Sequence, residues 1–68
     1  MTTLAHIPTS EMLNDLAESR MDMFSHMKLG FADDYPRIKV NRQIIEAIKS
    51  ELERRGGTVP PCSFPNVP

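Results

Sequence analysis

The sequence TSEMLNDLAESRMDMFSHMK, residues 9–28, decides the fold because it predicts a long amphipathic helix with two unlike faces. At about 100° per residue, methionine, leucine and phenylalanine fall within one broad arc, and four carboxylates occupy the opposite side. Thr9 is the expected N-cap, and Gly30 is expected to end the helix. The apolar side chains expected in the core or at a dimer interface are Met12, Leu13, Leu16, Met23, Phe24 and Met27.

Arg20 interrupts this apolar arc. An unpaired buried charge is costly, so the guanidinium must reach solvent or find a partner. One interpretation is that the stem covers apolar surface while the charged head lies in water. The other is an ion pair that fixes register, either with Glu51 across a hairpin or with a carboxylate of a second copy.

Glu11, Asp15, Glu18 and Asp22 form the opposite face, called here the acidic row. Their spacing places like charges one turn apart, which costs a few tenths of a kcal/mol per pair. A solvated face explains such a row, and so does a docking strip for a basic partner. Exposed neighbouring carboxylates lack the low-dielectric setting that separates pKa values, so the row predicts no general acid–base pair.

A second helix is predicted over residues 42–55, with Asn41 as its N-cap and Gly56 after its end. Pairs of opposite charge three and four residues apart neutralise its outer face, whereas the acidic row has none. The first helix is therefore the expected place for a partner to bind. The apolar stripe expected in the core or at a dimer interface is Val40, Ile44, Ile45, Ile48 and Leu52.

Residues 29–40 connect the two helices in a loop that is predicted to be ordered. Phe31 and Tyr35 offer apolar anchors, and the following proline disfavours helical geometry at Tyr35. Polar and apolar side chains alternate over residues 37–40, RIKV, which predicts a short extended segment with Ile38 and Val40 facing inward.

Residues 58–68, TVPPCSFPNVP, contain four prolines and are expected to be extended, either docked through apolar side chains or free. They form a predicted tail after a helical hairpin domain, residues 1–57. Cys62 is the only cysteine, which excludes an internal disulfide, and the two histidines are too few for an expected structural zinc site. No cofactor is expected.

These elements predict an all-α fold, an antiparallel two-helix hairpin with an ordered connecting loop. A chain of 68 residues buries only about 60% of its unfolded surface. The apolar arc of residues 9–28 is also wider than one partner helix over residues 42–55 can bury. We therefore predict association, most simply a homodimer in a four-helix arrangement. The sequence shows no transmembrane stretch or signal peptide, which predicts a soluble cytoplasmic protein that does not bind membranes.

Residues 37–56, RIKVNRQIIEAIKSELERRG, resemble the first half of a ribbon-helix-helix repressor, a short alternating strand followed by a helix that ends in a basic residue and glycine. In that family the strands of two subunits pair and place polar side chains in the DNA major groove. Prolines at positions 60 and 61 exclude the family's second helix. The DNA contacts that the resemblance implies are Arg37, Lys39, Asn41 and Arg42.

The leading functional prediction is a non-enzymatic protein-binding regulator or inhibitor that occupies a surface of a larger protein. The acidic row would face a basic surface, and Phe31, Tyr35 or the tail would supply the apolar contacts that dominate affinity. No nucleophile–base pair is evident, so no catalytic residue is assigned. The alternative prediction is a DNA-binding repressor that uses the basic residues of 37–42.

Overall fold

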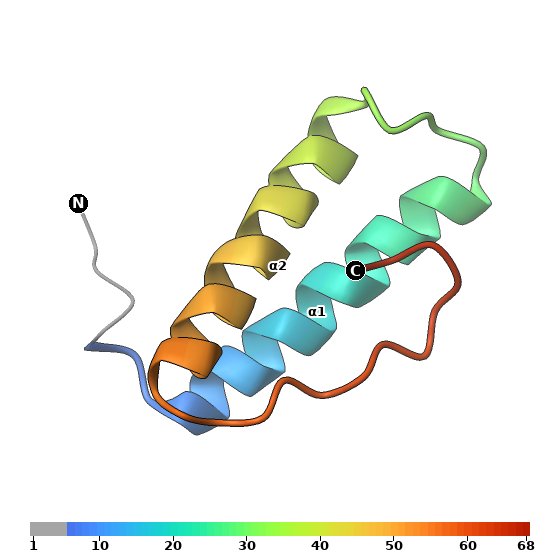
Figure 1. Ribbon diagram of the computed structural model, residues 1–68. Coiled ribbons are helices and arrows are strands. Elements are labelled where there is room, and N and C mark those ends of the chain that lie inside the picture. The colour runs from blue at the N-terminus through green and yellow to red at the C-terminus, as the bar shows by residue number, and fades with distance from the viewer. Residues whose placement is uncertain (1–5) are drawn as a thin grey trace.

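The computed structural model describes residues 6–68 and contains two antiparallel helices, α1 (Thr9–Lys28) and α2 (Pro36–Arg54) (Figure 1). No strand occurs within residues 6–68. The predicted all-α class and two-helix hairpin are therefore confirmed. In Figure 1, α1 lies between α2 on one side and the C-terminal residues 58–68 on the other.

α1 begins at Thr9 and ends two residues before Gly30, close to the predicted limits, but the Thr9 side chain does not cap the helix. No side chain caps the first turn, and the Thr9 hydroxyl instead accepts a hydrogen bond from Arg55 Nη1 at 3.0 Å. At the other end Gly30 adopts a φ of 96°, and its N–H donates to the Met27 carbonyl at 3.1 Å. Glycine is the residue that adopts this left-handed conformation without strain, which explains why the helix stops there.

α2 begins earlier than predicted, at Pro36 rather than after Asn41. The extended segment predicted at residues 37–40 is wrong, because these residues form the first turns of the helix. Proline at the first helical position lacks only an N–H that would have no helical partner, and its fixed φ suits the helix. Ile38 is fully buried, whereas Val40 is 49% exposed, as helical rather than alternating geometry requires. Asn41 is not an N-cap but a buried residue inside α2.

The core lies between the two helices and includes one side chain from the tail. Burial of these side chains drives the packing of the hairpin, because each contributes about 1.5–3 kcal/mol when fully buried. Leu13, Phe24 and Met27 pack against the core while remaining partly exposed, and Ile44 is 39% exposed. The buried apolar residues are Met12, Leu16, Met23, Ile38, Ile45, Ile48, Leu52 and Val67.

Residues 58–68 pack along α1 and cover the flank of that helix which α2 leaves open, called here the tail flank (Figure 1). Val67 is only 7% exposed, and the Phe64 ring stacks on Phe24 with 4.7 Å between ring centroids. The buried Arg20 donates from Nε to the main-chain oxygen of Pro68 at 3.1 Å. Much of the apolar arc of α1 is therefore covered within one chain, although Met21 at its border is 58% exposed. The tail thus reduces the surplus apolar surface from which the homodimer was predicted, and the oligomeric state stays a prediction.

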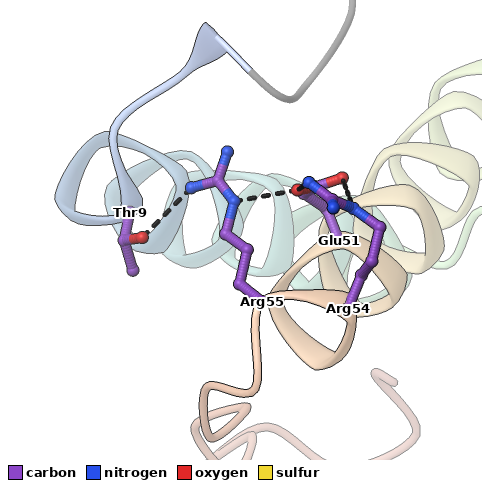
Figure 2. A network of polar contacts seen from close by, with 4 residues as sticks. All are labelled: Thr9, Glu51, Arg54 and Arg55. Carbon is purple, nitrogen blue, oxygen red and sulfur yellow. Dashed lines mark hydrogen bonds and ion pairs between the residues drawn. The ribbon is translucent and has the colours of Figure 1, made fainter.

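A polar network joins the start of α1 to the end of α2 (Figure 2). Glu51 pairs with Arg54 and also accepts a hydrogen bond from Arg55 Nε at 2.8 Å, while the same Arg55 reaches Thr9. The hydrogen bonds from Arg54, and then those from Arg55, lower the pKa of Glu51 to about 2. Glu51 is thus engaged at the hairpin end and is not the partner of Arg20.

Candidate protein-binding site

A groove runs between α1 and α2 on the flank of the hairpin that the tail does not cover. It consists of two hollows of about 360 and 400 Å³, and both are lined by Glu18, Ser19 and Ile44. Because the hollows share these residues, they form one continuous depression, called here the interhelical groove. Its other lining residues are Met12, Asp15, Asp22, Arg37, Asn41, Ala47 and Ile48.

The two walls of the interhelical groove differ in chemistry. Met12 and Ile48, with 1% and 4% of their surface exposed, form its buried apolar base. On the α2 wall, Ile44 and Ala47 are exposed aliphatic side chains, and Ile44 keeps 39% of its surface accessible. On the α1 wall, residues of the acidic row stand beside this apolar surface. The groove therefore offers apolar contact on one side and negative charge on the other.

Asp22 does not share the environment of the other members of the acidic row. It accepts hydrogen bonds from Asn41 Nδ2 at 2.6 Å and from Arg37 Nε at 2.8 Å. These two hydrogen bonds, with that from Asn41 the larger cause, lower the pKa of Asp22 from its ordinary value. Asp22 therefore holds α1 to α2 and satisfies the buried Asn41 amide, so its charge is largely used within the chain.

Glu11, Asp15 and Glu18 remain, and no side chain within residues 6–68 forms an ion pair with any of them. Glu11 and Glu18 are exposed, and Asp15 is partly buried against the groove. Three like charges therefore lie along about 10 Å of helix without internal compensation. A cation brought to this wall would relieve the repulsion among them.

Phe31 and Tyr35, predicted as apolar anchors, form an aromatic cluster with His26 at the turn of the hairpin. The Phe31 and Tyr35 rings stack with centroids 4.1 Å apart, and His26 lies 5.8 and 5.6 Å from them. Such pairs contribute about 0.5–1.5 kcal/mol beyond area burial, so the cluster orders the turn. His26 also lies 3.8 Å from an Asp22 carboxylate oxygen, which places the cluster beyond the Asp22 end of the acidic row. Glu11 lies at the opposite end of α1.

The residues implied as DNA contacts do not form the strand that such contacts require. All four lie on α2, where Asn41 is buried and Arg37 pairs with Asp22. Arg42 Nη2 is 3.3 Å from Asp33 Oδ1, which leaves Lys39 as the exposed member without an ion pair among residues 6–68. No paired-strand surface exists in the described chain, so no observation favours the DNA-binding alternative.

Ser19 and Ala47 are groove residues that the sequence reasoning did not assign to a site. Ser19 is 9% exposed and lies between the acidic row and the methionines of α1, and Ala47 lies across from it on α2. Small side chains at facing positions leave space between two packed helices, which is the signal that could have located the groove. Within residues 6–68, no group of three or more histidine, cysteine, aspartate or glutamate side chains is placed to hold a metal ion.

No family model, curated protein or solved structure matches this chain. Neither of the helices in residues 6–68 combines the length and the apolar character that crossing a bilayer needs. The inferences that follow therefore depend on the residues themselves.

Proposed function

We propose that this chain is a cytoplasmic, non-enzymatic protein-binding regulator or inhibitor that acts by occupying a basic surface of a larger protein. Glu11, Asp15 and Glu18 provide the charge that attracts the partner, and the exposed aliphatic residues of the interhelical groove provide apolar contact. Charge complementarity accelerates encounter and selects the partner, whereas desolvated apolar contacts supply most of the affinity.

The observation that carries this proposal is the difference within the acidic row. The chain uses Asp22 to join its own helices, but it leaves the three carboxylates before it without ion pairs in residues 6–68. Repulsion among like charges at helical spacing costs free energy that a basic partner would recover. Arg37, Arg42, Lys49, Arg54 and Arg55, by contrast, all have carboxylates near them.

Capture experiments with charge-reversed variants test the proposal. The tagged chain is incubated with a lysate of the organism of origin at low salt, and retained proteins are identified by mass spectrometry. We expect a retained protein that is lost with Asp15→Lys/Glu18→Lys and that dissociates as salt is raised, because exposed charges are screened within about 10 Å at 0.1 M salt.

Asp34→Lys/Glu53→Lys is the matched control, because it reverses two exposed carboxylates outside the groove and changes the net charge equally. This variant should retain the partner. Retention of the same proteins by both variants, with unchanged helical circular dichroism, would reduce the acidic row to a solvated surface and refute the proposed function.

A further inference from the structure

The hairpin has two long flanks beside the contact between its helices, and residues 6–68 cover one of them. Residues 58–68 occupy the tail flank, where Val67 is buried and Phe64 stacks on Phe24. On the other flank the interhelical groove leaves Ile44 and Ala47 exposed beside Asp15 and Glu18. The uncovered flank is therefore both apolar and negatively charged.

Backbone hydrogen bonding limits what can occupy this groove. Both walls are α-helices, whose main-chain groups are already bonded within each helix. They offer no row of donors and acceptors to an extended peptide, as an exposed sheet edge would. A helical segment satisfies its own backbone and presents only side chains. The tail faces the same constraint on its own flank. Four of its eleven residues are proline, which has no N–H that needs a hydrogen-bond partner.

The spacing of the charges also matches a helix. Glu18 follows Asp15 by three positions, and both line the groove, while Glu11 precedes Asp15 by four positions and continues the same face of α1 beyond it. Lysine or arginine at the same spacing on a helix aligned with α1 would meet each carboxylate. Apolar residues on its adjoining face would then pack on Ile44, Ala47 and Ile48.

We infer that the interhelical groove binds one basic amphipathic helix of a partner protein, which completes a three-helix bundle with α1 and α2. This inference rests on the proposed function and narrows it to a single segment of the partner. Anchoring side chains fill the hollow between Met12 and Ile48, and the basic residues of the helix pair with Asp15 and Glu18.

A synthetic peptide tests the inference on the complete chain. The probe has about 16 residues, enough for four turns, with leucine along one stripe and lysine on its flanks. A second peptide has glutamate at every lysine position. We expect saturable shifts of the methyl NMR signals of Ile44 and Ala47 with the lysine peptide, and affinity at least tenfold weaker for the glutamate peptide.

Ala47→Gln separates the groove from the acidic row, because its larger neutral side chain fills the groove and leaves the charges of Asp15 and Glu18 in place. Ala47 is exposed, so this change should preserve the fold. We expect at least a tenfold loss of affinity for the lysine peptide. Ala32→Gln, an identical change at an exposed position in the turn, should bind as the parent chain does.

Several outcomes would overturn the inference. These are equal binding of both peptides, shifts centred on Met21 and Phe64 of the tail flank, or unchanged affinity in Ala47→Gln. Groove signals that move on dilution of the chain alone, together with a dimer in light scattering, would assign the groove to a second copy instead. If a lysate partner is lost with Asp15→Lys/Glu18→Lys but kept by Ala47→Gln, the proposed function stands and this inference fails.

Discussion

The two flanks of the hairpin differ in how the helix surface outside the contact between α1 and α2 is covered. The tail flank carries Leu13, Arg20 and Phe24, which the chain covers with its own residues 58–68. The groove flank carries Asp15, Ser19 and Ile44, and residues 6–68 leave it open. The difference teaches that Met12 and Met23 of α1 are buried within a single chain. The surface that remains for a partner is the groove flank, which is less apolar and carries acidic side chains.

The largest expected effect comes from removing the apolar anchors of the tail. Phe64→Ala with Val67→Ala should lower the free energy of unfolding by about 3 kcal/mol, because it removes a buried side chain and an aromatic stack. Urea titration followed by circular dichroism measures the change. The matched groove-flank variant, Val40→Ala with Ile44→Ala, should stay within about 0.5 kcal/mol of the parent, because the higher helix propensity of alanine offsets the small loss of burial.

Equal destabilisation by the two double variants would break the comparison, since it would mean that the groove flank is as well packed as the tail flank. Separate measurement at several protein concentrations excludes a contribution from self-association.

A second, smaller effect on the free energy of unfolding distinguishes Asp22 from Asp15. Asp22→Ala leaves the buried Asn41 amide without its acceptor and should cost about 1–3 kcal/mol. Asp15→Ala should change stability by less than about 0.5 kcal/mol, because it removes no ion pair and relieves repulsion from Glu11 and Glu18. The same urea titration decides the question. Similar costs for the two alanines would contradict the division of the acidic row into structural and available charges.

The smallest effect concerns acid, and it depends on Glu51 and Asp22, the two carboxylates with a lowered pKa. The pKa of Glu51 is lowered to about 2 by hydrogen bonds from Arg54 and Arg55, and the pKa of Asp22 is lowered by those from Asn41 and Arg37. A carboxylate with a lowered folded-state pKa stabilises the protein above its unfolded-state pKa, and this contribution is lost as pH falls toward the folded-state value. Stability should therefore decline as the pH falls from ordinary carboxylate values toward 2.

Glu51→Gln should flatten this decline, and the remaining slope reports on Asp22. The difference should shrink at high salt because Arg54 is 64% exposed and its charge is screened. A pH dependence identical in the parent and Glu51→Gln would show that the network in Figure 2 does not contribute to stability.

The sequence predicts α1 well because its limits are set locally. Pro8 precedes it, Gly30 follows it, and the apolar period is regular between them. The predicted start of α2 is wrong because the four alternating residues 37–40 fit a strand as well as a helix, whereas Pro36 favours the first helical position. A helical period from Ile38 through Asn41 and Ile45 was the available signal, but a polar residue in the stripe obscured it.

The groove and the role of Asp22 depended on that same boundary. With α2 beginning at residue 42, Arg37 and Asn41 belong to a loop, and Asp22 looks like the other carboxylates of the acidic row. Once α2 extends to Pro36, both side chains face Asp22. The sequence leaves a docked and a free tail as alternatives, because docking depends on the fit of Phe64 and Val67 against α1. A local sequence pattern carries no information about that fit.

The hydrogen bond between Arg20 and Pro68 joins residues 48 positions apart. Contacts of such separation form late in folding, because chain entropy must be lost before they contribute. We expect the helices to pair first and the C-terminal residues to dock last. Arg20 is then solvated until the tail docks. In the native state, detachment of the tail should then be the cooperative opening with the lowest free energy. Amide hydrogen exchange near Phe64 and Val67 should therefore be faster than in the middle of either helix.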